Sequence, residues 1–183
     1  MTKEELNTKF RKAAQDGDTS LVKSLLSEDS ESDINVNGAD SSGSTAIHLA
    51  SQNNHIKVIE ELYLYKAQLD QQDKAGNTAL HIAMQYERLE AAELLIESGV
   101  NLMIPDKKGK TALDLAKEEH KEFYDKIIKI LVKSISQNDL DIKNIPEPHD
   151  QAIKNSVRTL LPHTERITGA RIDASSNECG RSI

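Results

Sequence analysis

The fold is decided by three short stretches of the chain: GSTAIHLA at residues 43–50, GNTALHIA at residues 76–83 and GKTALDLA at residues 109–116. Successive copies are 33 residues apart, and an aspartate stands three residues before each glycine. A fixed period between about 20 and 50 residues is the signature of a protein built from stacked repeats. Because one repeat buries its apolar face only against its neighbours, the sequence predicts a stack rather than a single central core.

The first two stretches carry the motif Thr-Ala-Ile/Leu-His-x-Ala, and the third has aspartate at the histidine position; the motif resembles the Thr-Pro-Leu-His-x-Ala motif of the ankyrin repeat. The resemblance implies an all-α ankyrin-repeat solenoid of four helix pairs with short hairpin connections, in which the first and last pairs are atypical caps. The repeats are placed at about residues 5–39, 40–72, 73–105 and 106–138, which together form one domain, 1–138. Residues 139–183, here called the tail, lack the period and are expected to be irregular, partly disordered or packed on the stack.

Capping signals and apolar spacing predict where the helices begin and end. Thr2 and Glu5 form a capping box that opens a first helix, and a second short helix follows Gly17. In the middle repeats, first helices are expected near 45–52 and 78–85, and second helices near 56–65 and 89–98. Gly99 fits the left-handed position that closes a helix. Lys66 occupies the equivalent place one repeat earlier, which predicts a strained turn.

The second helix of the last repeat departs from the pattern of the others. Apolar residues at helical spacing, with lysines between them, predict a lengthened helix that caps the stack. These apolar residues are Tyr124, Ile127, Ile128, Leu131 and Ile135. Beyond it, Ile145-Pro146-Glu147-Pro148 breaks any helix, and residues 151–161 could form one or two amphipathic turns.

His48 and His81 stand where the ankyrin family carries a histidine that bridges the threonine of its own repeat and the backbone of the next. The resemblance implies this structural role for both. Asp114 takes the place of histidine in the last repeat, which supports a stack that ends there. The family's proline at the first helical position is replaced by alanine in all three copies, and the freer unfolded chain predicts somewhat lower stability. The three alanines are Ala46, Ala79 and Ala112.

Composition and charge narrow the class of function. No apolar run approaches the roughly 18 residues of a membrane span. The formal net charge is −7, and residues 1–105 hold 17 of the 30 acidic side chains but 9 of the 23 basic ones, which argues against general nucleic-acid binding. The lone cysteine, Cys179, suits a reducing compartment. These features predict a cytoplasmic or nuclear protein that contacts neither membranes nor nucleic acids.

No residue pattern indicates catalysis, a metal site or a bound cofactor. The chain contains no Gly-rich phosphate loop, no His-Glu-x-x-His motif and no Gly-x-Ser-x-Gly motif. The histidines outside the repeat motif show no metal-type spacing with cysteine or carboxylate partners. Asp40, Asp73 and Asp106 recur with the period, and aspartates at repeat tips hold hairpin turns. The prediction is a protein that is not an enzyme, with no catalytic, cofactor-binding or metal-binding residue.

The predicted function is protein binding, by an adaptor or an inhibitor that is a monomer when unbound. Ankyrin proteins generally bind partners through hairpin tips and through the exposed face of the first helices, which together line a concave groove. Mapped onto this chain by the motif, the candidate tip residues are Ser42, Ser44, Lys74, Asn77, Lys107, Lys108 and Lys110. The candidate residues of the first helices are Gln52, Asn53, Gln85, Tyr86 and Glu118.

Tyr86 is the strongest anchor candidate, because an exposed tyrosine offers a large contact area at low entropic cost. The alternative is a solvated tyrosine that packs on its own helix. The three lysines of the last tip could receive an acidic segment or a phosphate, or could keep the end of the stack soluble. Tyr63 and Tyr65 fall on a second helix, away from the groove, and are expected to pack between repeats.

Three other roles stay open at the level of the sequence. The chain could be a secreted effector of an intracellular bacterium, acting on a host protein in the host cytoplasm or nucleus, with the tail as export signal. It could be a regulatory subunit whose tail occupies the active site of an enzyme. An enzyme with an unrecognised site in the groove is the third, and no cluster of acid, base or nucleophile supports it.

Overall fold

The computed structural model describes residues 2–27, 34–119 and 121–136. The chain divides into two units, 1–147 and 148–183, and all of the described residues belong to the first unit. Over these residues the backbone forms four consecutive pairs of helices and no strand. The pairs are α1 (Lys3–Asp16) with α2 (Thr19–Leu26), α3 (Ala46–Gln52) with α4 (Ile56–Leu64), α5 (Ala79–Gln85) with α6 (Leu89–Glu97), and α7 (Ala112–Glu119) with α8 (Lys121–Ser136). The predicted all-α repeat fold is confirmed, and the four helices of the middle repeats match their predicted ranges to within one residue at each end.

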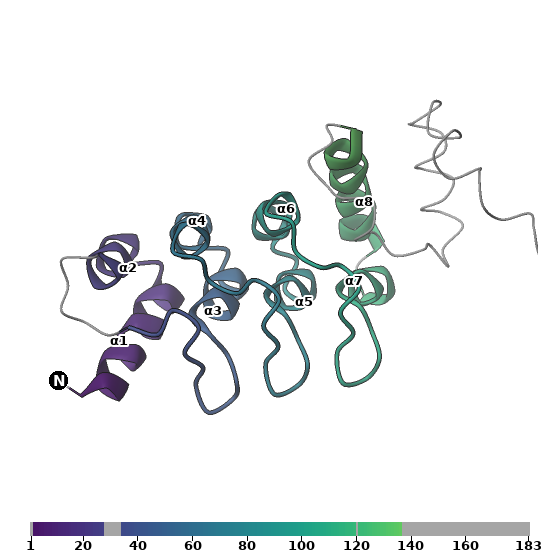
Figure 1. Cartoon of the computed structure of the whole chain (residues 1–183). Coiled ribbons are helices and arrows are strands. Elements are labelled where there is room, and N and C mark those ends of the chain that lie inside the picture. The colour runs from purple at the N-terminus through teal and green to yellow at the C-terminus, as the bar shows by residue number, and fades with distance from the viewer. Residues whose placement is uncertain (1, 28–33, 120, 137–183) are drawn as a thin grey trace, which may run out of the picture. The chain divides into compact units, whose positions relative to one another are not determined.

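The pairs stack so that like helices are neighbours. The first helices α1, α3, α5 and α7 each contact the next in the series, and so do the second helices α2, α4, α6 and α8. Figure 1 shows the two rows, with three long hairpins projecting from the first-helix row on the side away from the second helices. Hairpin tips and second helices therefore present two opposite sides of the stack.

Small and medium aliphatic side chains fill the layers between repeats. Each of α3, α5 and α7 has two alanines at inward positions, and all of these are buried: Ala46, Ala50, Ala79, Ala83, Ala112 and Ala116. The second helices contribute buried branched residues such as Val58, Ile59 and Leu95. Small side chains let neighbouring helices approach closely, and the buried aromatic residues, Phe10, Phe123 and Tyr124, belong to the first and last pairs. No pair in this arrangement could shield its apolar face alone.

Helix starts follow the polar residues that the sequence indicates. The Thr2 hydroxyl accepts a hydrogen bond from the Glu5 amide at 3.2 Å, and the Thr2 amide donates to the Glu5 carboxylate at 2.8 Å. This confirms the predicted capping box, which satisfies two amides that the first turn of a helix leaves unpaired. In α2 the Asp18 carboxylate accepts from the Leu21 amide at 2.9 Å.

Left-handed residues close the helices, and several of them are not glycine. Gly99 follows α6 with φ of 82°, as predicted, and Lys66 follows α4 with φ of 59°. Each turn is sealed by a backbone bond across it, from Ala67 N–H to Leu62 carbonyl in the case of Lys66 (2.9 Å). A non-glycine residue in this region costs about 1–2 kcal/mol. Two further left-handed residues, Asn54 and Glu87, follow α3 and α5 and were not predicted.

The last helix is longer than its equivalents, as expected. Helix α8 has 16 residues, whereas α4 and α6 have nine each. Its buried residues are Phe123, Tyr124, Ile127, Ile128 and Leu131. Four of these were predicted; Phe123 was missed, and the side chain of Ile135 lies outside the described residues. The predictions for the tail and for turns in residues 151–161 also fall outside them.

Replacing Lys66 by glycine should stabilise the protein. Glycine adopts a φ near 60° without steric cost, and its greater freedom in the unfolded chain offsets only part of that gain. We expect Lys66→Gly to raise the free energy of unfolding by roughly 0.5–1 kcal/mol, measured by urea denaturation. Glu60→Gly, a glycine placed in the middle of the same helix, should lower it by about 1 kcal/mol. A Lys66→Gly protein less stable than wild type would contradict the strain assigned to this turn.

Candidate functional site

Each of the three hairpins is built in the same way around an aspartate. The Asp40 carboxylate accepts hydrogen bonds from the amides of Ser42 (2.8 Å) and Ser44 (2.9 Å), and the Asp40 amide donates to the Ser44 carbonyl (2.9 Å). The hairpins that begin at Asp73 and Asp106 repeat these bonds at 2.7–2.9 Å. The aspartates hold turns, as predicted, and their carboxylates are engaged by backbone amides.

Neighbouring hairpins are joined to one another by their backbones. The Lys74 amide donates to the Ser42 carbonyl at 2.9 Å, and the Lys107 amide donates to the Ala75 carbonyl at 3.0 Å. The close approach requires glycine: a Cβ added to Gly43 would lie 2.7 Å from the Lys74 nitrogen. The tips therefore form a preformed surface, in which side chains that the turns do not use can meet a partner.

The carboxyls of Asp40 and Asp106 have lowered pKa values. Burial opposes ionisation of Asp40, but the hydrogen bonds from Ser42 and Ser44 outweigh it and hold the pKa of this carboxyl below its usual value. At Asp106 burial likewise opposes ionisation, but the hydrogen bonds from the amides of Lys110 and Lys108 outweigh it and lower the pKa of the carboxyl. Groups of this kind stabilise the fold above a pH of about 4 and lose that contribution as the pH falls further.

His48 and His81 link each repeat to the next. The Nδ1 atom of His48 accepts from the Thr45 amide at 3.2 Å and lies 2.9 Å from the Thr45 hydroxyl, while Nε2 lies 3.0 Å from the carbonyl oxygen of Asn77 in the next repeat. Since an amide can only donate, Nδ1 carries no proton, and Nε2–H donates to the carbonyl. His81 makes the same contacts with Thr78 and with the Lys110 carbonyl, the latter at 3.2 Å. The bridging role implied by the family motif is what the geometry shows.

Asp114 keeps half of this arrangement. Its carboxylate accepts from the Thr111 amide at 2.9 Å and from the Thr111 hydroxyl at 2.7 Å, so the helix start is capped as in the other repeats. An ionised carboxylate has no proton to donate to a following carbonyl. The glycine of this hairpin fits the same account: a Cβ on Gly109 would meet nothing within 4 Å, in contrast to Gly43 and Gly76.

Burial of the two histidines sets their protonation. Both rings are almost fully buried, and burial lowers the pKa of His48 and of His81 below the usual value of the side chain. The carbonyl partner and the nearby Asp73 carboxylate act in the opposite direction at both rings and do not outweigh it. The neutral form with the proton on Nε2 is thus the one that the bridge uses.

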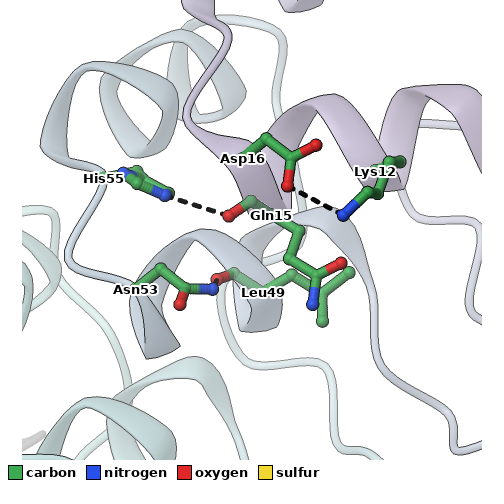
Figure 2. A network of polar contacts seen from close by, with 6 residues as sticks. All are labelled: Lys12, Gln15, Asp16, Leu49, Asn53 and His55. Carbon is green, nitrogen blue, oxygen red and sulfur yellow. Dashed lines mark hydrogen bonds and ion pairs between the residues drawn. The ribbon is translucent and has the colours of Figure 1, made fainter.

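A second set of contacts between repeats lies at the turns that join first and second helices. His55 Nε2 lies 2.9 Å from the Gln15 carbonyl, and at the equivalent position one repeat later the Arg88 Nε donates to the Gln52 carbonyl at 2.8 Å. Figure 2 shows the His55 contact beside the Lys12–Asp16 ion pair of α1. Sequence reasoning missed these bonds, although the spacing of 33 residues between His55 and Arg88 was a signal that the two could play one role.

With this geometry in place, comparison with known proteins identifies the family. A model of the ankyrin repeat family, three copies long, matches residues 10–106 and 61–144. The chain belongs to the ankyrin-repeat family. No curated protein matches the chain. Ankyrin repeats are generic modules of protein–protein interaction, and the candidate residues can now be located on this framework.

The candidate tip residues fall into two groups. Exposed at the tips are Ser42, Lys74, Lys107 and Lys108. Half-buried ones are Ser44, Asn77 and Lys110. The Ser44 hydroxyl accepts from Ser42 at 3.0 Å, and the Asn77 side chain donates to the Asp73 carboxylate at 3.1 Å, so both are engaged within their own hairpins.

The candidate residues of the first helices lie at the carboxyl ends of these helices. Gln85 and Tyr86 are exposed, with 42% of Tyr86 accessible, and Gln52 is half-buried. Asn53 is exposed, but its side-chain amide donates to the Leu49 carbonyl at 3.0 Å and so caps its own helix (Figure 2). Glu118 belongs to α7, and its side chain lies outside the described residues.

One prediction for the second helices is wrong. Tyr63 and Tyr65 do not pack between repeats: 49% of Tyr63 and 38% of Tyr65 are accessible, and Leu64 between them is 68% accessible. The inter-repeat positions of α4 are taken instead by Val58, Ile59 and Leu62.

Within the described part of the chain, no group of three histidine, cysteine or acidic residues could hold a metal ion, and no helix is long and apolar enough to cross a membrane.

The buried histidines predict a loss of stability in mild acid. The unfolded chain takes up protons near pH 6.5, whereas folded His48 and His81 resist them, so the free energy of unfolding should fall as the pH is lowered from 7.5 to 5.5. The slope can reach about 1.4 kcal/mol per pH unit for each histidine. Urea denaturation at several pH values measures it, and the double variant His48→Gln/His81→Gln should show a flatter profile. Equal slopes in the two proteins would contradict the assignment.

Proposed function

We propose that the protein binds another protein through the hairpin tips and the exposed ends of the first helices. The observation that carries this proposal is the rigidity of the tips. Each turn is closed by an aspartate and bonded to its neighbour through the backbone, while the side chains of Lys74, Lys107 and Lys108 project from it exposed. A preformed surface avoids most of the ordering cost of association.

The charges of the tips favour an acidic segment on the partner. Position 41 of the first hairpin is serine, and the equivalent positions of the next two hairpins are Lys74 and Lys107. Lys108 adds a further exposed cation to the last hairpin. The Asp106 carboxylate beneath them is engaged by the amides of Lys108 and Lys110. Cations therefore accumulate along the tips of a chain whose formal net charge is −7, and an acidic partner would be steered toward them.

Tyr86 supplies an apolar anchor for the same surface. It directly follows α5, where the equivalent residues are Asn53 and Glu119, so the tyrosine is not required by the repeat. Tyrosine at the centre of an interface contributes disproportionately to affinity. A partner that places an apolar residue on Tyr86 and acidic residues on the lysines would use both features.

These features favour the role of an adaptor or an inhibitor, which acts by occupying the surface of its partner. The two roles that depend on the tail, an export signal and a segment that enters an enzyme's active site, rest on residues 139–183, which lie outside the described residues. The competing explanation of the tip lysines is that they keep the end of the stack soluble. A binding experiment distinguishes this role from a role in partner binding.

An affinity capture with matched variants tests the proposal. Bait proteins would be wild type, Tyr86→Ala and Lys74→Glu/Lys107→Glu/Lys108→Glu, with Lys57→Glu on the opposite side of the stack as control. We expect a partner that is captured by wild type and by Lys57→Glu and that is reduced at least tenfold with the other two. The proposal is wrong if every captured protein is retained by both tip-face variants.

A further inference from the structure

The second helices carry an exposed apolar cluster that the repeat does not need. Tyr63, Leu64 and Tyr65, here called the α4 patch, stand together at the end of α4 and are 49%, 68% and 38% accessible. They are three of the five large hydrophobic residues that are exposed in the described part of the chain. Figure 1 places α4 in the row of second helices, on the side away from the hairpins, so the α4 patch is separate from the surface proposed above.

The next repeat shows what the fold itself requires at these positions. One period later, Leu64, Tyr65 and Lys66 are replaced by Glu97, Ser98 and Gly99. Helix α6 ends in the same way as α4 with these polar residues, so the exposed leucine and tyrosine are not needed to close a second helix. The α4 patch also directly precedes the left-handed Lys66, where the next repeat has an unstrained glycine. An exposed apolar cluster and a strained turn at one place are features that are found at functional sites.

Acidic side chains of α4 and of the neighbouring helix α6 lie on the same face as the α4 patch. Glu60 is one helical turn before Leu64 and is exposed. Its equivalent on the neighbouring helix α6 is Glu93, and the equivalent of Leu64 is Glu97, so the repeat itself puts these three glutamates on one face. Together they are here called the glutamate row. Glu61 is not counted, because it is only 14% accessible and pairs with Lys23 of α2 at 2.8 Å.

Few cations oppose this charge on α4 and α6. Lys57 is the one basic residue of these two helices, and the equivalent residue of α6 is Glu90. Glu90 accepts a hydrogen bond from the Asn54 side chain at 2.9 Å, which lowers the pKa of its carboxyl and keeps it charged. The face is therefore apolar at its centre and acidic toward α6, while Lys66 directly follows the α4 patch and Lys23 of α2 pairs with Glu61. An anionic membrane surface would be repelled by it, whereas a basic protein segment would be attracted.

From this juxtaposition we propose that the α4 patch and the glutamate row form a second docking surface, which receives a basic amphipathic helix of a partner protein. The apolar side of that helix covers Tyr63, Leu64 and Tyr65, and its lysines or arginines lie over Glu60, Glu93 and Glu97. An amphipathic helix supplies both sets of contacts from adjacent positions of one segment. This inference stands independently of the partner proposed for the hairpin tips.

A designed peptide that combines an apolar face with a basic face tests the surface directly. The probe is an 18-residue helical peptide with leucine on one face and lysine on the other, and its binding to the full chain is measured by fluorescence anisotropy. The key variant, Leu64→Glu/Tyr65→Ser/Lys66→Gly, installs the residues that the next repeat already uses, so it should fold. We expect it to bind the peptide at least tenfold more weakly than wild type, and Glu93→Lys/Glu97→Lys to do the same.

The controls separate this surface from the tips and from self-association. Tyr86→Ala removes an exposed aromatic residue of the other surface and should leave the affinity unchanged, and a peptide with glutamate in place of lysine should bind at least tenfold more weakly. Absence of peptide binding, or equal binding by wild type and the Leu64→Glu/Tyr65→Ser/Lys66→Gly variant, overturns the proposal. Light scattering that shows a wild-type dimer and a monomeric variant would also overturn it, because a second copy of the chain would then cover the α4 patch.

Discussion

A pair of short helices cannot shield its own apolar side, and this constraint governs the whole structure. Each pair needs a neighbour, and the neighbour must be held at a distance that buried alanines and branched side chains can fill. Two sets of hydrogen bonds fix that distance. The imidazole of His48 or His81 spans from its own helix start to a carbonyl of the next repeat, and the hairpin backbones bond to each other directly. The buried layers supply the driving force, and these bonds set the register.

The same periodicity makes departures from the repeat informative. Asp114 keeps the contact of the histidine with threonine but has no proton for a further repeat, and Gly109 has open space where Gly43 and Gly76 have a neighbouring backbone. Leu64 and Tyr65 stand where the next repeat has Glu97 and Ser98. In a chain whose repeats fold alike, such differences indicate either an end of the stack or a surface with a separate function.

Much of the fold could be predicted because its determinants are local or recur with the period. Thr2 and Glu5 are three residues apart, and the motif histidines identify themselves by position. Contacts such as Arg88 with Gln52, or Asn54 with Glu90, could not be predicted, since they depend on how side chains of neighbouring repeats meet after stacking.

The same limit applied to the candidate site. The exposed lysines of the tips were found from the motif alone, but the engagement of Asn77 with Asp73 depends on the conformation of the turn. The position of Tyr63 was misjudged for a related reason: an aromatic residue in an apolar helix is expected to be buried, and the inward positions of α4 were already filled by smaller residues.

The histidine bridge is the interaction on which the account depends most, and its protonation can be observed directly. Long-range ¹H–¹⁵N correlation spectra of the imidazole rings report which nitrogen carries the proton. We predict that His48 and His81 are neutral at pH 7, with the proton on Nε2 and a bare Nδ1, and that both rings stay neutral at the pH where a free imidazole begins to take up a proton. A proton on Nδ1, or titration of both rings at the pH of a free imidazole, would show that the bridge between repeats does not exist in solution.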